Sequence, residues 1–321
     1  MSKPQLSSRI NVTLAKAGAY DDGAVRKAAA VLDFLDIPLA SGDRVLIKPN
    51  LLRADVLTCT NATIIAAVCR YLLDKGCRVT VGDSPGFGTA KGIAKSIGLD
   101  RALESAGCAS VPVMTLDSPV MKPLTCGGFI GLSRHALEAD YIVNLPKLKA
   151  HAQMRVTGAV KNLFGCISGV RKAFAHSRYG DKERNGIQVF PSLVADILTH
   201  LPPVVTLMDG ITAMHVRGPS GGREFPARLL AASASPVALD TAVYSMLGVS
   251  PEEIPLWREL QRRMAPGAFL EEIALSGEDI GEFDLSGFML PATLAPQTFN
   301  PFRLAVSTAK RLWARAAPGG S

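Results

Sequence analysis

The hydrophobic residues of the chain recur in short runs, each followed by a polar residue with Gly or Pro and then by a stretch with helical spacing. Short apolar runs of this kind predict buried strands, because the strands of a parallel sheet are covered on both faces. The expected strands are Arg44–Ile47, Arg78–Gly82, Val111–Leu116, Tyr141–Val143, Val204–Met208 and Leu229–Ala232.

The stretches between these runs predict helices, and two of them carry recognisable end signals. Thr60 is expected to cap one helix that Gly76 stops, while Ser235 and Pro236 mark the start of another. The expected helices are Asn61–Lys75, Thr89–Ile97, Leu99–Ala106, Val156–Phe164, Pro191–Thr199, Pro236–Met246 and Trp257–Met264.

Strands and helices that alternate in this way predict right-handed βαβ units. We therefore expect an α/β fold, with a mostly parallel sheet, helices on both faces and an active site at the C-terminal strand ends. Residues 1–290 form the expected catalytic domain, which allows two lobes. Residues 291–321 form a Pro-containing linker and a basic C-terminal tail helix.

The length and composition are sufficient for a large hydrophobic core. The chain has 321 residues, of which 48% are hydrophobic, enough for an extensive core. No apolar run reaches the roughly 18 residues of a transmembrane helix, and the N-terminus has no apolar signal-peptide core. We therefore expect a cytoplasmic protein.

The net charge of +7 is concentrated at the C-terminal end. After Asp284 the chain has no acidic residue but carries Arg303, Lys310, Arg311 and Arg315. This basic tail fits a peripheral contact with an acidic membrane or a protein partner, and it equally fits a solvated terminal helix. No nucleic-acid partner is expected, since no recognised motif and no interleaving of aromatic and basic residues occurs.

The six cysteines give no sign of a metal cluster. None forms a C-x-x-C pair, which argues against a zinc ribbon and makes a ferredoxin-type iron–sulfur cluster unlikely from spacing. Scattered buried thiols in a reducing compartment are the expected arrangement. Cys166, just after Gly165, is either a thiolate near the lysines or a packed structural residue.

Four of the expected strands end in a polar residue, namely Lys48, Asp83, Asn144 and Asp209. The C-terminal ends of the strands in an open parallel sheet converge on a crevice, where ligands bind. These side chains are therefore candidate ligand contacts. The alternative is that each merely caps the turn that follows, as Asp and Asn often do.

The densest group of polar residues lies in the segment Asn144-Leu-Pro-Lys-Leu-Lys-Ala-His. Lys147, Lys149 and His151 are spaced two apart, so an extended strand places them on one face. Ten residues later, Lys161 lies in an otherwise apolar stretch, where burial of an ammonium group requires a carboxylate or a ligand.

These lysines, with Arg155 beside a predicted helix N-terminus, form a candidate anion site for a carboxylate or phosphate. His151 titrates near neutrality and is a candidate general acid or base, with Asp83 or Asp209 orienting it. The alternative is a basic surface strand. The expected substrate-binding residues are Lys48, Asn50, Lys147, Lys149, Asn162 and Ser220, the last in the Gly218–Gly222 turn.

Other chemistry receives weaker support. Asp83, Asp209, Asp240 and His151 suit a hard or borderline metal ion, but no His-x-x-His spacing accompanies them. The loop after Gly86 lacks a phosphate-binding motif, and no G-x-S-x-G sequence is present. The stretch Arg171–Arg184 is either a basic lid over an anionic ligand or a solvated loop.

Several motifs together resemble the family called domain of unknown function 362. They are Ile47-Lys-Pro-Asn-Leu, Val81-Gly-Asp-Ser-Pro-Gly, Asn144-Leu-Pro-Lys-Leu-Lys-Ala-His, Thr157-Gly-Ala-Val-Lys-Asn-Leu-Phe-Gly, Met208-Asp-Gly-Ile, Gly218-Pro-Ser-Gly and Ser235-Pro-Val-Ala-Leu-Asp, spanning about residues 40–250. Many members look like iron–sulfur proteins with an appended ferredoxin segment. This chain has no such cysteine run.

A looser resemblance is to the nickel-pincer lactate racemase family, in which a His is followed ten residues later by a Lys in a Gly-rich stretch. His151 and Lys161 have this separation and precede Gly165 and Gly169. The resemblance implies that His151 is the acid/base and that Lys161 anchors a cofactor or substrate. It also implies a metal or nickel-pincer-type cofactor, although the N-terminal Asp-His-Thr-Arg signature of that family is absent.

The residues and resemblances together favour an enzyme that acts on a small anionic metabolite, a racemase- or epimerase-like isomerase. His151, Lys161, Asp83 and Asp209 are its expected catalytic residues. Two alternatives belong to other functional classes: an iron–sulfur or redox accessory protein, and a non-catalytic module that binds a metabolite.

Overall fold

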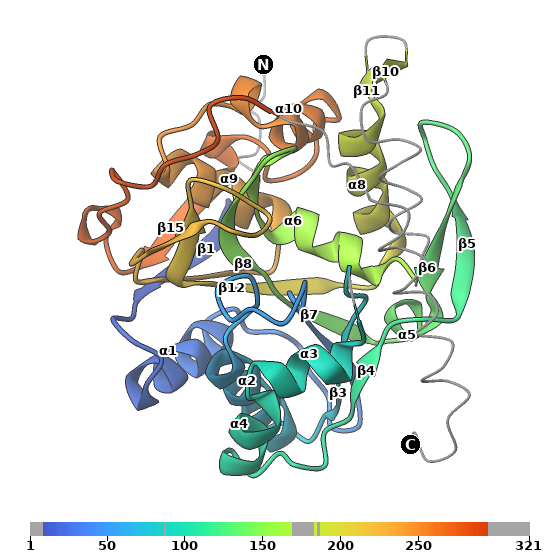
Figure 1. Cartoon of the computed structure of the whole chain (residues 1–321), viewed down its shortest axis with the longest axis vertical. Coiled ribbons are helices and arrows are strands. Elements are labelled where there is room, and N and C mark those ends of the chain that lie inside the picture. The colour runs from blue at the N-terminus through green and yellow to red at the C-terminus, as the bar shows by residue number, and fades with distance from the viewer. Residues whose placement is uncertain (1–8, 87, 169–182, 185–186, 295–321) are drawn as a thin grey trace, which may run out of the picture.

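The computed structural model describes residues 9–86, 88–168, 183–184 and 187–294. Within these residues an eleven-stranded sheet forms the centre of the molecule (Figure 1). Its main path runs in the order β15-β1-β14-β12-β7-β2-β3-β4. These strands are β1 (Ile10–Lys16), β2 (Arg44–Pro49), β3 (Arg78–Asp83), β4 (Val113–Thr115), β7 (Tyr141–Leu145), β12 (Val204–His215), β14 (Leu229–Ser233) and β15 (Ile273–Gly277).

The main path is mostly parallel, as expected. The pairs β12–β7, β7–β2, β2–β3, β3–β4 and β15–β1 are parallel, and β14 runs antiparallel to both of its neighbours. Three further strands join the sheet through β12: β8 (Lys147–His151) is parallel to it, β9 (Arg155–Thr157) pairs with β8, and β13 (Arg223–Phe225) is antiparallel to it.

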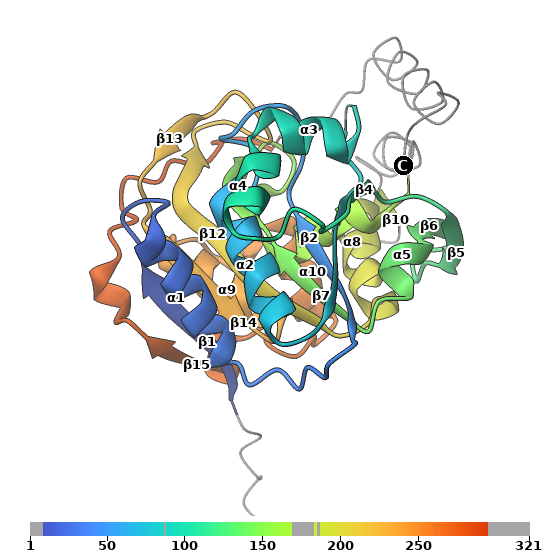
Figure 2. The ribbon, with the colours of Figure 1, turned by 90° about the horizontal axis from the view of Figure 1, so that it is seen from below.

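One layer of helices covers the lower face of the sheet, as Figure 2 shows from below. It consists of α1 (Asp22–Asp33), α2 (Ala62–Asp74), α3 (Ala90–Ser96) and α4 (Leu99–Ser105). Their apolar sides bury Leu32, Ile65 and Leu103 in one core cluster with strand residues such as Ile47 and Val81. This burial removes apolar surface from water and holds the layer on the sheet.

A second layer covers the opposite face (Figure 1). It consists of α6 (Ala159–Asn162), α8 (Val189–His200), α9 (Pro236–Met246) and α10 (Pro255–Arg262). Phe164, Phe190 and Leu193 belong to one core cluster on this side, and Leu239 and Trp257 belong to another. The fold is therefore α/β, with a mostly parallel sheet between two helical layers, as the sequence predicted.

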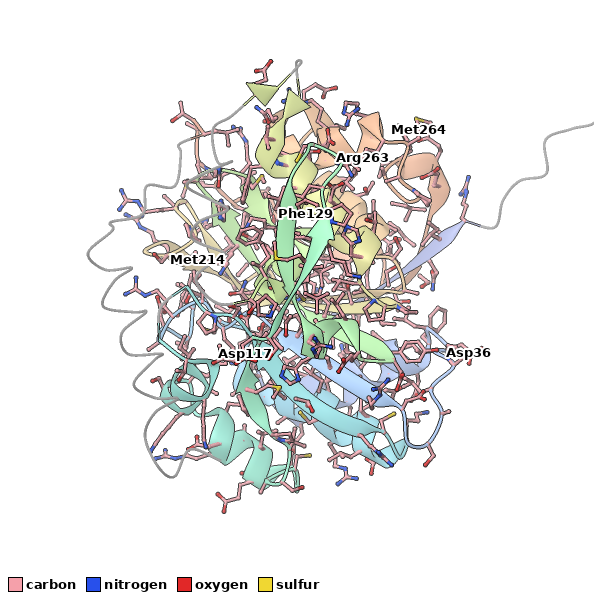
Figure 3. All side chains as sticks on the ribbon, turned by 90° about the vertical axis from the view of Figure 1, so that its right-hand side faces the viewer. Asp36, Asp117, Phe129, Met214, Arg263 and Met264 are labelled. Carbon is pink, nitrogen blue, oxygen red and sulfur yellow. The ribbon has the colours of Figure 1, made fainter. Side chains whose placement is uncertain are left out.

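A hairpin lies outside the main sheet. Its strands β5 (Pro119–Pro123) and β6 (Phe129–Ser133) pair antiparallel, and Phe129 is exposed on the edge that faces the viewer in Figure 3. Arg263 ties the hairpin to the helices: it donates to Asp196 in α8 at 2.7 Å and to Thr125 in the hairpin turn at 3.1 Å. The short pair β10 (Glu183–Arg184) and β11 (Ile187–Gln188) forms another two-stranded sheet.

The helix expected over Val156–Phe164 is wrong in its first half. Arg155–Thr157 forms strand β9, because it pairs with β8. Gly158 is extended, so the helix α6 starts only at Ala159. It spans four residues and passes into the 3-10 turn Leu163–Cys166. Pairing with a neighbouring strand therefore overrides the local helical spacing.

Two other details differ. Asn61, rather than Thr60, caps α2 by accepting from the Thr63 amide, while the Thr60 hydroxyl donates to the Leu145 carbonyl. The strand expected to end at Met208 continues to His215, so Asp209 lies inside β12 rather than after it.

Two predicted segments lie wholly or mostly outside the described residues. They are the stretch Arg171–Arg184, of which 183–184 are described, and the C-terminal linker and tail, of which 291–294 are described. Within the part of the chain that the structure describes, no helix is both long enough and apolar enough to cross a bilayer.

Candidate active site

Lys48 and Asp83, from the ends of the neighbouring strands β2 and β3, form a buried ion pair. The Lys48 Nζ atom lies 2.8 Å from the Asp83 Oδ1 atom, and both side chains are almost fully buried. Asp83 also accepts from the amides of Leu51 and Ser84, each at 2.7 Å. The pair joins two strand ends, as expected, with the carboxylate held by backbone donors on both sides.

Gly165 provides the space for this ion pair. A Cβ atom at Gly165 would lie 2.2 Å from the Asp83 Oδ1 atom and 2.5 Å from the Lys48 Nζ atom. Separations below 3 Å do not occur between real Cβ atoms and such neighbours, so a larger residue must displace one of the two charges. Gly165, the last residue of the Thr157–Gly165 motif, is therefore needed for packing.

Lys147 and Asp209 form a second buried ion pair, 2.9 Å long. The Tyr20 hydroxyl, which sequence reasoning missed, completes the group: it accepts from Lys147 at 2.7 Å and donates to Asp209 at 2.8 Å. Asp209 further accepts from the Asn61 amide at 2.9 Å. Burial and the Asp209 charge raise the pKa of Tyr20 above its usual range, so the phenol keeps its proton.

Two neutral oxygens accept hydrogen bonds from Lys149. Its Nζ atom donates to the Asn50 Oδ1 atom at 3.1 Å and to the Thr58 carbonyl at 2.9 Å, and the side chain is buried. Burial raises the pKa of the Cys59 thiol, and the positive charge of Lys149 partly offsets this rise. The ammonium group of Lys149 therefore lies beside Asn50, the residue that follows the end of β2.

A chain of side-chain amides connects Lys149 to the interior. The Asn50 Nδ2 atom donates to the Asn162 Oδ1 atom at 3.1 Å, and the Asn162 Nδ2 atom donates to the Asn144 Oδ1 atom at 2.8 Å and to the Lys48 carbonyl at 3.1 Å. Asn144 lies opposite Lys48 in the β2–β7 register. Each amide accepts on one side and donates on the other, which fixes its orientation.

His151, at the end of β8, is held by the turn that follows it. Its Nδ1 atom accepts from the amides of Gln153 at 3.1 Å and Met154 at 3.2 Å. Burial, with the charges of Lys161 and Lys149, lowers the pKa of His151 well below 6.5. The imidazole is therefore neutral at pH 7 and lies among the two ammonium groups.

The turn containing Ser220 packs against this strand end. The Ala152 amide donates to the Gly218 carbonyl at 3.0 Å, and a Cβ atom at Gly218 would lie 1.6 Å from the Ala150 carbonyl. Ser220 follows in the same turn and is partly exposed. The structure thus brings the Ser220 turn beside His151, on the rim rather than in the buried part of the site.

Lys161 projects from α6 against two aromatic rings. Its Nζ atom lies 4.6 Å from the centroid of Phe164 and 5.6 Å from that of Phe190, distances that permit cation–π attraction. Lys161 is only 8% exposed, and its positive charge is one of the causes that lower the pKa of His151. The structure thereby collects Lys149, His151 and Lys161 from β8 and α6.

The expected anion site at the helix N-terminus is wrong, because Asp240 fills it. The Asp240 carboxylate accepts from the amides of Ala159 and Val160 at the start of α6. Burial raises the pKa of Asp240 to about 7. Arg155 turns away and pairs with Glu253 at 2.9 Å.

The expected roles of the carboxylates also need correction. Asp83 and Asp209 hold Lys48 and Lys147, whereas the Nδ1 atom of His151 is oriented by backbone amides. Asp240 caps α6. Among the described residues, no three His, Cys, Asp or Glu side chains gather in a group suited to a metal ion.

The comparisons with known proteins identify relatives along nearly the whole chain. The family described as Domain of unknown function (DUF362) matches residues 45–245. A Synechocystis protein named thylakoid-associated protein sll1697 is 32% identical over 322 residues, covering 95% of this chain and 95% of that protein.

Two solved structures are more distantly similar. The lactate racemase apoprotein from Thermoanaerobacterium thermosaccharolyticum has 15% identity and a TM-score of 0.44, covering 76% of this chain and 58% of that one. A Thermotoga maritima protein has 12% identity and a TM-score of 0.42, covering 66% and 56%. This chain thus spans less than two thirds of either structure, and similarities of this size assign no residue role.

The family match and the similarity to the Synechocystis protein agree with the motifs around Lys48, Asp83, Lys147 and Lys161. The protein therefore belongs to the family Domain of unknown function (DUF362).

Proposed function

We propose that the protein is an enzyme that binds a small carboxylate or phosphate between Lys149 and Lys161 and acts on it beside His151. One observation carries the proposal: Lys149 and His151 of β8 and Lys161 of α6 are buried, and both lysine charges help to lower the pKa of the imidazole. Perturbed titrating groups that gather at the carboxyl edge of a sheet are typical of catalytic sites.

In this proposal the four buried lysines have two different roles. Lys48 and Lys147 are paired with Asp83 and Asp209, and in this proposal they hold the strand ends in place. Lys149 and Lys161 supply positive charge for the ligand anion. Burial strengthens that attraction, since the low local dielectric screens charges less than water does.

The best-matched reaction class is isomerisation of a small 2-hydroxy acid, in which a hydrogen at the carbon beside the carboxylate is exchanged. This assignment follows the His151 and Lys161 spacing that the chain shares with the lactate racemase family. In an alternative form of the proposal, Lys161 anchors a nickel-pincer-type cofactor, which would supply hydride chemistry, and Lys149 alone supplies positive charge for the carboxylate. Lys149 then orients the carboxylate.

The test starts with natively purified full-length protein. L-lactate and other 2-hydroxy acids serve as probes, and chiral chromatography follows conversion to the opposite enantiomer. We expect turnover in the wild type and in Lys75→Met, which replaces an exposed lysine at the C-terminal end of α2, but none in Lys161→Met or His151→Phe. Full turnover in both site variants rejects the proposal.

The same preparation separates the two alternatives. Elemental analysis and intact mass measurement detect bound iron, another metal or an adduct on Lys161. An iron-containing protein without turnover supports a redox accessory role. Lactate or phosphate binding without turnover, and without metal or adduct, supports a non-catalytic module.

We further propose that the protein makes a peripheral contact with an acidic membrane through residues 295–321. The support is the excess of basic residues there, with no acidic residue after Asp284, and the printed name of the Synechocystis relative, which describes it as thylakoid-associated. Co-sedimentation with vesicles containing anionic lipid tests this. Deletion of residues 295–321 should release the protein, and binding that survives the deletion contradicts the proposal.

A further inference from the structure

The hydrogen bonds around His151 fix which ring nitrogen carries the proton. The Nδ1 atom accepts from two backbone amides, those of Gln153 at 3.1 Å and Met154 at 3.2 Å. A ring nitrogen that accepts hydrogen bonds uses its lone pair and carries no hydrogen. In the neutral ring the hydrogen must then be on the other nitrogen, Nε2.

The other protonation states conflict with the same contacts. A hydrogen on Nδ1 would point at two N–H groups that cannot turn away, because they belong to the backbone. The doubly protonated ring has this conflict too, and in addition it places a third positive charge beside Lys149 and Lys161. Burial and these two charges lower the pKa of His151, in agreement with a neutral ring.

Packing keeps the turn with these amides in place. The Ala152 amide donates to the Gly218 carbonyl at 3.0 Å. The two segments are so close that a Cβ atom at Gly218 would overlap the Ala150 carbonyl oxygen. Met154 is buried in the core. The amides that hold Nδ1 are therefore anchored independently of any ligand.

Resting on the proposed function, we propose that His151 meets its ligand as a neutral hydrogen-bond donor through Nε2–H, and that the ligand atom it contacts is an oxygen that carries or develops negative charge. In this state Nε2 has no lone pair with which to remove a proton. Of the acid and base roles that the resemblance to the lactate racemase family implies for His151, this state excludes the base.

The inference narrows the chemistry of the ligand. Lys149, Lys161 and the Nε2 atom of His151 are all donors, so a ligand that contacts the three must present acceptors to each. A carboxylate with an adjacent hydroxyl or carbonyl oxygen satisfies them: the lysines take the carboxylate and His151 takes the neighbouring oxygen. A donor that the backbone holds in place in this way stabilises negative charge on that oxygen.

The first test measures the tautomer directly and needs no ligand. In the full-length protein labelled with ¹⁵N-histidine, two-bond ¹H–¹⁵N correlation spectra at pH 7 distinguish protonated from unprotonated ring nitrogens. The His151 signals are those that disappear in His151→Gln. We expect a proton on Nε2 alone. A proton on Nδ1, or on both nitrogens, overturns the inference whether or not the protein proves to be an enzyme.

The second test measures the donor role with phosphate and L-lactate as probes in isothermal titration calorimetry. The terminal amide of Gln can reach the place of Nε2 and donate, whereas Phe fills the same space without a donor. We expect His151→Phe to bind at least roughly tenfold more weakly than His151→Gln, as loss of one hydrogen bond to a charged group implies.

The control is His135→Phe, because His135 is exposed on the surface. This variant should bind both probes as the wild type does. Equal losses in the Gln and Phe variants, or no loss in either, refute the donor role. If the wild type itself binds neither probe, the proposed function fails, and the tautomer measurement still decides the state of the ring.

Discussion

Replacement of Lys48 by Met should be among the most damaging changes to this protein, although it leaves the size of the side chain nearly unchanged. Lys48 is fully buried, and its Nζ atom lies 2.8 Å from Asp83. Loss of one partner leaves a buried carboxylate without its ammonium. Changes of this kind cost about 3–5 kcal/mol, since the remaining charge keeps its desolvation penalty.

The chain contains a matched control. Lys75 lies 2.9 Å from Asp33, nearly the same separation, but both side chains are about half exposed. Water screens such a pair, so Lys75→Met should cost about 0–1 kcal/mol. Burial, rather than distance, accounts for the difference between the two expected values.

The assay is equilibrium unfolding in urea, followed by circular dichroism, on wild type and both variants. The double variant Lys48→Met/Asp83→Asn adds a second comparison. With the buried negative charge removed, it should be more stable than Lys48→Met alone. The reasoning is refuted if Lys48→Met costs no more than Lys75→Met, or if the double variant is no more stable than Lys48→Met.

Three further predictions concern the residues that support the site. Gly165→Ala should destabilise the protein strongly, because its Cβ atom would collide with the Lys48–Asp83 pair, whereas Gly86→Ala, where the nearest atom would be 3.6 Å away, should not; urea unfolding that gives equal losses would contradict this. Asn162→Asp removes the donor to two buried oxygens and should lower the free energy of unfolding by about 2–4 kcal/mol. This loss should shrink at acidic pH, where the new carboxyl group carries a proton. A loss that stays constant with pH would contradict this explanation. The raised pKa of Asp240, about 7 against 3.8, means that the folded state binds the extra proton. Its contribution to stability is therefore full below pH 3.8 and is lost as the pH rises through about 7. Asp240→Asn should flatten that slope between pH 5 and 8, and an unchanged slope would show that another group causes it.

The sequence predicted the frame of the fold and the principal charges of the site. The buried apolar runs around Lys48, Asp83 and Asn144 are strands of a parallel sheet, and their polar ends lie at one edge because parallel strands end together. The helix Pro236–Met246 was predicted to the residue, since Ser235 and Pro236 form a strong start signal.

The long-range partners were not predictable from local patterns. Tyr20 meets Asp209 across 189 residues of sequence, and no local signal marks a single Tyr in a loop as part of a charged group. Asp240 was assigned to metal chemistry, yet it caps α6 from 80 residues away. Such pairings depend on how the helices dock, and sequence spacing carries no information on docking.

The N-terminal strand β1 and helix α1 were also missed. Strand β1 alternates apolar and polar residues from Ile10 to Leu14 and lies one strand in from the sheet edge, where β14 and β15 flank it. This alternation was a usable local signal for a half-buried strand. The prediction for the short helix α6 began too early in the sequence, because the pairing of β9 with β8 competes with helical spacing.

The central claim is that Lys149, His151 and Lys161 form one site for an anionic ligand. A crystal structure of the full-length protein soaked in sodium L-lactate tests it most directly. The account predicts one carboxylate within hydrogen-bond distance of both lysine Nζ atoms, with the neighbouring hydroxyl oxygen facing the Nε2 atom of His151. Lactate bound only elsewhere, or lysines that point away from a bound anion, would contradict it.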